Sequence, residues 1–404
     1  MAPRVGLAHV GAVSFLAARV APTGSFWLSL AGGAALAREA ELRGMRAGYA
    51  SSGAAMLETV AIVGPLRLNA PLTQAMTAPL LGAMHRRRRR WLSQFLACLT
   101  IRLLHYTVLT AFAVLVLLGP KAYAGSYHTL FGWLPFLPGG LEGALIVTAI
   151  GNVAFAIFFS VIQVSFYRHA LAGWSARAQG QSPPRHVRPV PARETGRLDP
   201  RIALLAATLV TVLLLITHTW VVLAAVAAWL AVAWIFARHG DRDVLKVGLV
   251  LALTLAVGTL VASLIGGLGL NEAASRGVRA ALLVIVPTWL RLAAGSAGLR
   301  EAFRRTLLRL RLPGLREASE ILSELDSGPL LADSARGLRE QLRGVDHQVI
   351  PVANAVLSWA ASEADSLPVQ APRPAALLRL RPGDAMVAVS VLLPAGALAA
   401  VLVP

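Results

Sequence analysis

The stretch IALLAATLVTVLLLITHTWVVLAAVAAWLAVAWIFA, residues 202–237, contains no Asp, Glu, Lys or Arg. A membrane-spanning helix needs roughly 20 consecutive, mostly apolar residues. The stretch therefore predicts two closely spaced spans, over 202–217 and 220–237. Comparable apolar runs lie elsewhere in the chain, at 92–119, 142–168, 245–269, 278–295 and 384–403. Together these runs predict an all-α, polytopic membrane protein.

The composition agrees with this class of protein. Of 404 residues, 56% are hydrophobic and only 14% are charged, whereas an ordinary globular protein is about 25% charged. The formal net charge is +18. A nucleic-acid-binding protein can also be this basic, but nucleic acid as a partner leaves the long apolar runs unexplained. The sequence has no phosphate-binding Gly-x-x-x-x-Gly-Lys-Ser/Thr loop and no zinc motif. We therefore expect no cofactor, and no enzymatic activity of this chain by itself.

The arginines predict the orientation of the chain, because cytoplasmic loops are rich in Lys and Arg. Five arginines run from Arg86 to Arg90, and a Pro- and Arg-rich linker covers 176–196. Two predicted spans lie between the arginine run and the linker, and four lie between the linker and a basic segment at 297–367. An even number of spans returns the chain to the same side of the membrane. All three are therefore expected in the cytoplasm, in a multi-pass protein of the plasma membrane. The linker divides the chain into an N-terminal membrane domain of unknown role, 1–175, and a second membrane domain, 197–404.

Two apolar stretches near the N-terminus are less regular, 5–37 and 54–82. Each contains breaks, and each is compatible with one span, a broken pair of helices or a re-entrant piece protected by its neighbours. Arg38, Arg43 and Arg46 have a cytoplasmic pattern, yet a single span at 54–82 would place them outside. For that reason we expect a helical hairpin or a re-entrant segment at 54–82.

Glu58 is a candidate functional residue of the N-terminal half, because an ionisable group at membrane depth marks a functional site by default. It lies in Met56-Leu57-Glu58-Thr59. In the functional interpretation it faces a cavity or pairs with Arg67. In the structural interpretation it is a charge near the start of a helix in an interfacial hairpin.

The segment 297–367 has the pattern of four amphipathic helices and is too polar to span a membrane. The third, at about 330–344, has an apolar stripe of Leu331, Ala335, Leu338 and Leu342 and a basic stripe of Arg336, Arg339 and Arg343. The fourth begins near Pro351 and has a heptad-like seam of Ile350, Ala353, Leu357, Ala360, Ala364 and Leu367. Basic amphipathic helices rest on anionic headgroups, which fits the first helix. The third and fourth favour a platform that docks a partner protein.

Three short motifs flank the spans of the second half. They are Arg197-Leu198-Asp199-Pro200-Arg201, Pro287-Thr288-Trp289-Leu290-Arg291 and Arg381-Pro382-Gly383-Asp384. With the cytoplasmic helices between the second and the third, this order resembles the transmembrane T component of energy-coupling factor (ECF) transporters, the EcfT/CbiQ family. The resemblance covers about 197–404, roughly half the chain. The N-terminal half has no counterpart in a plain T component.

The resemblance implies a role for the third cytoplasmic helix. In that family, two coupling helices each carry an Ala-Arg-Gly-like signature whose arginine inserts into a groove of an ATP-hydrolysing subunit. Ala335, Arg336 and Gly337 match this signature in the expected region, with Arg339 and Arg343 along the same basic stripe. The second signature is expected near the end of the fourth helix, but residues 363–368 contain no arginine, so the second contact is either missing or made by another group.

The implied function is that of a scaffold or permease subunit of an ATP-driven importer, similar to cobalt- or vitamin-uptake systems. Its implied partners are ATP-binding-cassette ATPase subunits, with a substrate-binding membrane subunit as a further candidate. The N-terminus lacks a metal-binding His pattern, which argues against nickel or cobalt as the substrate. Two other functions stay open: a secondary transporter or channel that uses Glu58, and a membrane scaffold without transport that docks a cytoplasmic partner.

Overall fold

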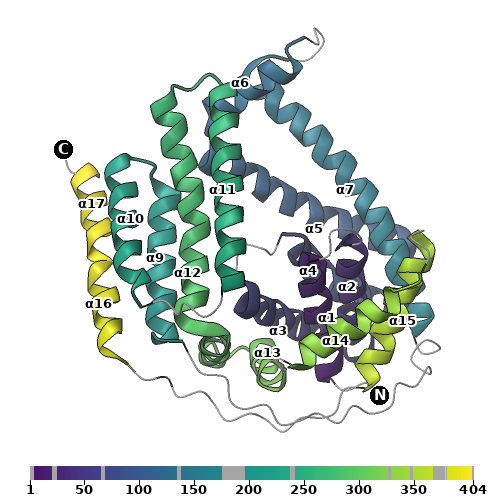
Figure 1. Ribbon diagram of the computed structural model, residues 1–404. Coiled ribbons are helices and arrows are strands. Elements are labelled where there is room, and N and C mark those ends of the chain that lie inside the picture. Colours follow the sequence, from purple (N-terminus) through teal and green to yellow (C-terminus); the bar gives the residue numbers. More distant parts are fainter. Residues whose placement is uncertain are drawn as a thin grey trace. The chain divides into compact units, whose positions relative to one another are not determined.

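The computed structural model describes residues 4–20, 25–64, 69–133, 138–174, 196–236, 242–325, 329–345, 349–366, 378 and 380–402. Within these ranges the chain forms helices and no β-strand (Figure 1). The predicted all-α fold class is therefore confirmed. Arg67 and nearly all of the predicted linker lie outside the described residues.

The helices form two compact units whose segments alternate along the sequence. Unit 1 contains Met1–Arg102, Ala156–Arg193 and Arg300–Ala376, and unit 2 contains Leu103–Phe155, Glu194–Leu299 and Leu377–Pro404. These units differ from the consecutive domains expected on either side of the linker, because Arg300–Ala376 clusters with the N-terminal helices. That 1–175 and 197–404 are separate membrane domains stays a prediction.

Unit 1 is built around the N-terminal helices. It contains α1 (Arg4–Val20), α2 (Ser25–Arg43), α3 (Met45–Val63), α4 (Asn69–Arg86), α13 (Pro313–Glu324), α14 (Pro329–Leu342) and α15 (Val349–Ser366). The first part of α5 (Trp91–Phe112), the second part of α7 (Gly140–Ala172) and the end of α12 (Leu270–Arg309), from Arg300 on, also belong to it. Small residues allow the backbones to approach closely: a Cβ on Gly6 would collide with the carbonyl of Ala364, and one on Gly82 with that of Ala37.

The stretch 54–82 is resolved as two helices. Its helices α3 and α4 run antiparallel, because Tyr49 donates to the carbonyl of Met76 at 2.9 Å and Ser52 to that of Ala75 at 2.6 Å. The stretch 5–37 is likewise a pair of helices, α1 and α2. Two helices are thus present at 54–82, as expected, and whether they form a hairpin in the membrane or a re-entrant segment stays a prediction.

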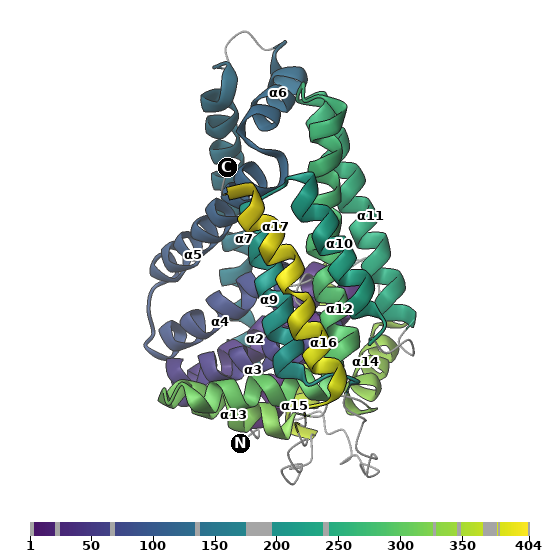
Figure 2. The same cartoon turned by 90° about the vertical axis from the view of Figure 1, so that its left-hand side faces the viewer.

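The apolar faces of helices α13, α14 and α15, in the segment 297–367, are covered within unit 1. Helix α13 lies against α3 (Figure 2), with Ile321 and Leu322 in one small core with Ala50 and Ala54. Helices α14 and α15 pack on α1 and α2 in a larger core. Their buried residues in that core are Leu338, Val356, Leu357, Trp359, Ala360, Ala361 and Ala364. The seams predicted from the sequence therefore have a partner inside the chain.

Unit 2 is a group of long helices that run side by side in both views (Figures 1 and 2). It contains α9 (Pro200–Ile216), α10 (Trp220–Trp234), α11 (Arg242–Ile265), most of α12 (Leu270–Arg309), α16 (Pro382–Ser390) and α17 (Leu392–Leu402). A π-helical turn, Ala113–Leu118, and α6 (Pro120–Phe131) also belong to it.

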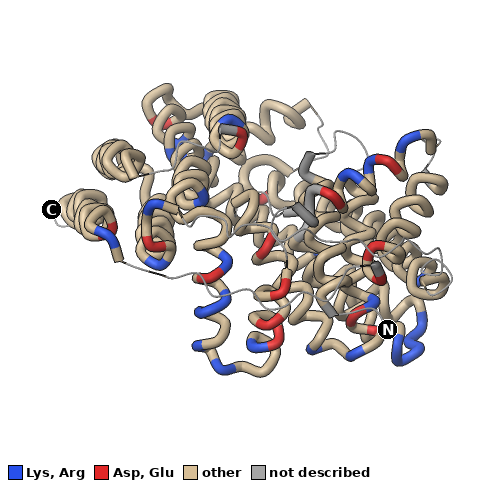
Figure 3. The backbone as a smooth tube through the Cα atoms, turned by 60° about the horizontal axis from the view of Figure 1, so that its bottom comes forward, with Lys and Arg blue, Asp and Glu red and all other residues tan. Residues whose placement is uncertain are grey.

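Among the residues that the structure describes, five helices are long and apolar enough to cross a membrane. They are Trp91–Leu118, Gly140–Ala172, Asp243–Ile265, Leu270–Arg309 and Pro382–Val401. Helices α9 and α10 are apolar but shorter. Large apolar side chains on these helices face outward, among them Ile150, Phe155, Val250 and Leu253, each more than 60% exposed. Basic residues lie mainly near helix ends and loops, with long uncharged stretches between them (Figure 3). Such surfaces suit lipid rather than water, so the chain is a multi-pass membrane protein.

A kink at Gly295 separates the predicted span 278–295 from the amphipathic helix that follows it. The φ of Gly295 is 70°, which lies in the region that favours glycine. The kink leaves carbonyls of α12 without their helical partners. The backbone N–H groups of Gly196 and Leu198 bind the carbonyls of Ala294 and Ala293 at 3.1 and 3.3 Å. The start of the second half thereby stabilises the end of the span.

Candidate functional site: an arginine face on a buried anchor

Helix α14 presents the basic stripe that the sequence predicted. Arg336, Arg339 and Arg343 are all exposed, and the Arg336 side chain is 71% exposed. Arg336 Nη2 donates to the carboxylate of Asp333, one turn earlier. A surface pair of this kind contributes only about 0.3–0.5 kcal/mol. The guanidinium can therefore exchange Asp333 for another anionic partner at little cost.

The neighbours of Arg336 are small, as expected, but one prediction for this helix was wrong. Ala335 was assigned to the apolar stripe, whereas it is exposed, and Gly337 is half-buried. Leu338 is buried as predicted, and Leu331 lies outside the residues whose side chains are described. The exposed Ala335 beside Arg336 leaves room for the backbone of a partner to come close.

The opposite side of α14 is fixed by a buried polar chain. Ser334 is 0% exposed and donates to the carboxylate of Glu363 on α15. His9 Nε2 on α1 lies 3.0 Å from Ser334 Oγ, which is free to accept a hydrogen bond from it. His9 and Glu363 are also buried. Buried hydrogen-bonded networks of this kind favour one arrangement of the helices, so α14 is held in a defined position on the N-terminal helices.

Glu363 lies where the second coupling signature was expected. Instead of an arginine directed outward, the structure has an acidic side chain directed into the core and bound to Ser334. In the seam of α15, Leu357, Ala360 and Ala364 are buried as predicted. Ile350 was placed in that seam wrongly, since it is 73% exposed.

Glu58 forms a buried ion pair with Arg300. Glu58 is 0% exposed and the Arg300 side chain 11% exposed. Arg300 Nε donates to Glu58 Oε2 at 2.6 Å, and Nη2 donates to Oε1, so the contact is bidentate. Sequence reasoning considered Arg67 as the partner and missed Arg300, because 242 residues separate the pair. The contact joins α3 to the part of α12 that follows the kink at Gly295.

The motifs at both ends of the second half meet in unit 2. Asp384 Oδ1 accepts from the backbone N–H of Asp199 at 2.7 Å, and Oδ2 accepts from that of Arg381 at 2.6 Å. Arg381 Nη1 in turn donates to the carbonyls of Gly196 and Arg197, both at 2.9 Å. Asp199 caps α9 through a bond from the backbone N–H of Arg201. These residues form a structural clasp.

The remaining motif, residues 287–291, packs helices together within the same unit. Trp289 is fully buried, stacks edge-on against Trp229 at 5.1 Å and donates to the carbonyl of Ala233 at 2.9 Å. Thr288 lies against Gly248 of α11, where a Cβ would collide with it. The motif therefore holds α12 against α10 and α11.

A buried polar cluster in the apolar spans was missed. Arg102 on α5, 4% exposed, donates to Gln163 Oε1 on α7, and its guanidinium lies 5.7 Å from the ring of Phe159. Gln163 Nε2 donates to Thr77 Oγ1 at 2.6 Å, and Cys98 Sγ lies 3.4 Å from Gln163 Oε1. The signal was present in the sequence, since an arginine within an apolar run is a functional candidate.

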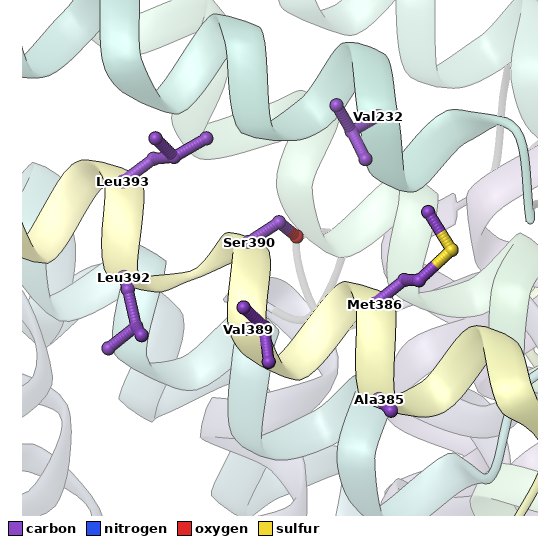
Figure 4. A pocket seen from close by; sticks show the side chains of 7 residues that line it. All are labelled: Val232, Ala385, Met386, Val389, Ser390, Leu392 and Leu393. Carbon is purple, nitrogen blue, oxygen red and sulfur yellow. The ribbon is translucent and has the colours of Figure 1, made fainter.

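An apolar groove lies on the surface of unit 2, between α10 and the C-terminal helices (Figure 4). Its lining residues are Val232, Ala385, Met386, Val389, Ser390, Leu392 and Leu393. Ser390 is the one polar side chain among them. Acyl chains of the bilayer suit such a lining, so the groove supports the membrane assignment and indicates no specific ligand.

Comparison with known proteins adds no further constraint. No protein-family model, no curated protein and no solved structure matches the chain.

Proposed function

We propose that the protein is a membrane scaffold subunit of an ATP-driven importer, which docks an ATP-hydrolysing partner through the arginine face of α14. The observation that carries the proposal is the two-sided character of this helix. Arg336 and Arg339 are exposed on one side, with Arg343 exposed in the turn directly after the helix, while Ser334 and Leu338 are buried on the other side. A helix fixed to its own chain can transmit the movement of a partner, whereas a loosely attached helix absorbs it.

The Glu58–Arg300 pair adds a second connection between the cytoplasmic segment and the N-terminal helices. A bidentate arginine–carboxylate contact is directional as well as strong. Together with the His9–Ser334–Glu363 chain, it ties this segment to α1 and α3 at two separate places. In the proposed mechanism, movement of the ATPase at α14 reaches the membrane helices through these connections.

The test is a charge reversal at the proposed contact. Arg336→Glu should abolish co-purification with the ATP-binding-cassette ATPases of the same organism, because breaking a buried charged pair costs about 3–5 kcal/mol, or more than about a hundredfold in affinity. The matched control is Arg309→Glu, an exposed arginine at the end of α12, for which an effect of about 1 kcal/mol is expected. Equal and mild effects of both substitutions would refute the docking role.

A secondary transporter is the second candidate, and the Arg102–Gln163–Thr77 cluster favours it. Ionisable residues buried between spans mark substrate and ion pathways. Glu58 supports this candidate less, since Arg300 already neutralises it. Proteoliposomes without any ATPase distinguish the two functions. Uptake that is driven by an ion gradient and lost in Arg102→Gln would support a secondary transporter, whereas strict dependence on the ATPase would support the importer.

A further inference from the structure

Two buried arginines lie near the start of α12 in unit 2. Arg276 and Arg279 are three residues apart and so project from one side of the helix. They are 9% and 3% exposed. Arginines are rarely this buried unless they are paired, so each requires an account of what its charge contacts.

Arg276 pairs with a carboxylate and packs tightly against the backbone of Gly119. Its Nη2 donates to Glu272 Oε1 at 2.8 Å. Its guanidinium also lies directly against Gly119, where a Cβ would come within 2.7 Å of Cζ and Nη2. Gly119 has a φ of +79° and ends the π-helical turn Ala113–Leu118. Single π-helical turns are rare and occur often at functional sites.

Arg279 is the unusual member of the pair. Its Nε and Nη2 are buried, and no hydrogen-bond acceptor within the described part of the chain reaches them. Leaving a charged group buried and uncompensated is strongly destabilising. Arg276 next to it has the same charge and adds to this cost.

The surroundings add positive charge. His218, in the turn between α9 and α10, is half-buried, and its pKa is lowered by burial and then by the charges of Arg276 and Arg279, against an opposing effect of Glu272. Lys121 at the start of α6 lies within electrostatic reach of Glu272. Glu272 thus pairs with Arg276 and lies within reach of Lys121, but it does not reach Nε or Nη2 of Arg279.

We propose that Arg276 and Arg279 form a binding site for an oxyanion, a carboxylate or a phosphate group. The planar guanidinium donates two parallel hydrogen bonds to such groups. A water molecule could accept from Nε or Nη2, but only an anion also neutralises the second charge. The proposal is independent of ATPase docking, since every residue of the site belongs to unit 2 and none to α14.

The site lies away from the cytoplasmic ends of these helices in the predicted topology. It is next to the turns at 217–219 and 266–269, whereas the clasp of Asp199 and Asp384 marks the opposite ends of α9 and α16. An oxyanion would therefore arrive from the outer side, either free in solution or as the headgroup of an anionic lipid.

Thermal unfolding of the purified protein in nanodiscs tests the proposal and separates the two sources. One arm uses phosphatidylcholine discs with inorganic phosphate, compared with sodium chloride at equal ionic strength. The other arm uses phosphatidylglycerol discs without phosphate. Stabilisation in the first arm alone identifies a free anion, and stabilisation in the second alone identifies a lipid headgroup; either result supports the site.

Two variants make the test specific. Arg279→Gln removes the uncompensated charge, so in phosphatidylcholine discs with chloride alone it should be at least as stable as the native protein. It should also bind the effective anion at least about tenfold more weakly, as expected for loss of hydrogen bonds to a charged group. Arg197→Gln, at an exposed arginine of the same unit, should leave the response unchanged. The proposal is overturned if neither arm stabilises the native protein, or if Arg279→Gln responds fully.

Discussion

Replacing Glu58 with glutamine should destabilise unit 1 strongly. The substitution keeps the size of the side chain but removes the charge that Arg300 contacts through two hydrogen bonds. Arg300 is then left as a nearly buried cation, because its side chain is only 11% exposed. The same substitution at Glu320 is the matched control, since Glu320 pairs with Arg316 on the surface of α13 and both side chains are more than half exposed.

The two pairs differ in expected energy by several-fold. Breaking a buried ion pair by removing one partner costs about 3–5 kcal/mol, whereas an exposed pair contributes about 0–1 kcal/mol. In a domain of 150–250 residues, 1 kcal/mol shifts Tm by about 2–4 °C. Glu58→Gln should therefore lower Tm by about 6 °C or more. Glu320→Gln should change Tm by no more than about 4 °C.

The measurement is intrinsic-tryptophan fluorescence during heating of the detergent-purified protein. The double variant Glu58→Gln/Arg300→Gln completes a cycle: it should be less destabilised than the two single changes combined, because it leaves no buried charge without a partner. Equal, small Tm shifts for Glu58→Gln and Glu320→Gln would show that the buried pair does not stabilise the fold.

Three further outcomes are expected. A cysteine at position 316 should react with an impermeant maleimide only after cells are permeabilised, and native Cys98, 0% exposed, should stay unlabelled; labelling of position 316 in intact cells would contradict the topology. Co-expressed fragments 1–185 and 186–404 should co-purify through the packing of α14 and α15 on α1 and α2, and separate elution would count against that core. The pKa of His218 is lower in the folded protein than in the unfolded chain, so as pH falls the unfolded chain is protonated before the folded protein. The stability of the protein should therefore fall as pH drops below about 6.5. In melting curves recorded at several pH values, His218→Asn should reduce that fall.

The features that the sequence predicted well depend on local pattern. The long apolar runs became helices because a backbone in an apolar environment must satisfy its own hydrogen bonds. Arg336 and Arg339 are exposed as the helical periodicity indicated. The kink at Gly295 follows the change from an apolar run to an amphipathic pattern. These properties are set by residues within a few turns of one another.

The features that could not be predicted depend on distant partners. Periodicity shows which face of α14 is buried but not what buries it, so its seam was assigned to another protein. Arg300 was overlooked as the partner of Glu58 because nothing in either local sequence encodes a contact across 242 residues. Ala335 and Ile350 were placed on apolar faces by spacing alone, whereas Ala335 lies beside the face that Ser334 and Leu338 bury, and Ile350 lies in the exposed first turn of α15.

The interleaving of unit 1 has a consequence for synthesis. His9 and Ser334 are 325 residues apart, and a ribosome that adds about 5–20 residues per second needs about 15–65 s to cover that distance. Throughout this interval α1 and α2 are complete, while α14 and α15, which cover part of their apolar surface, do not yet exist. That part of the surface must be covered by the insertion machinery or by lipid until α14 and α15 are made. A chain that terminates before α14 would keep that part of the surface permanently without α14 and α15 and should be degraded by membrane proteases.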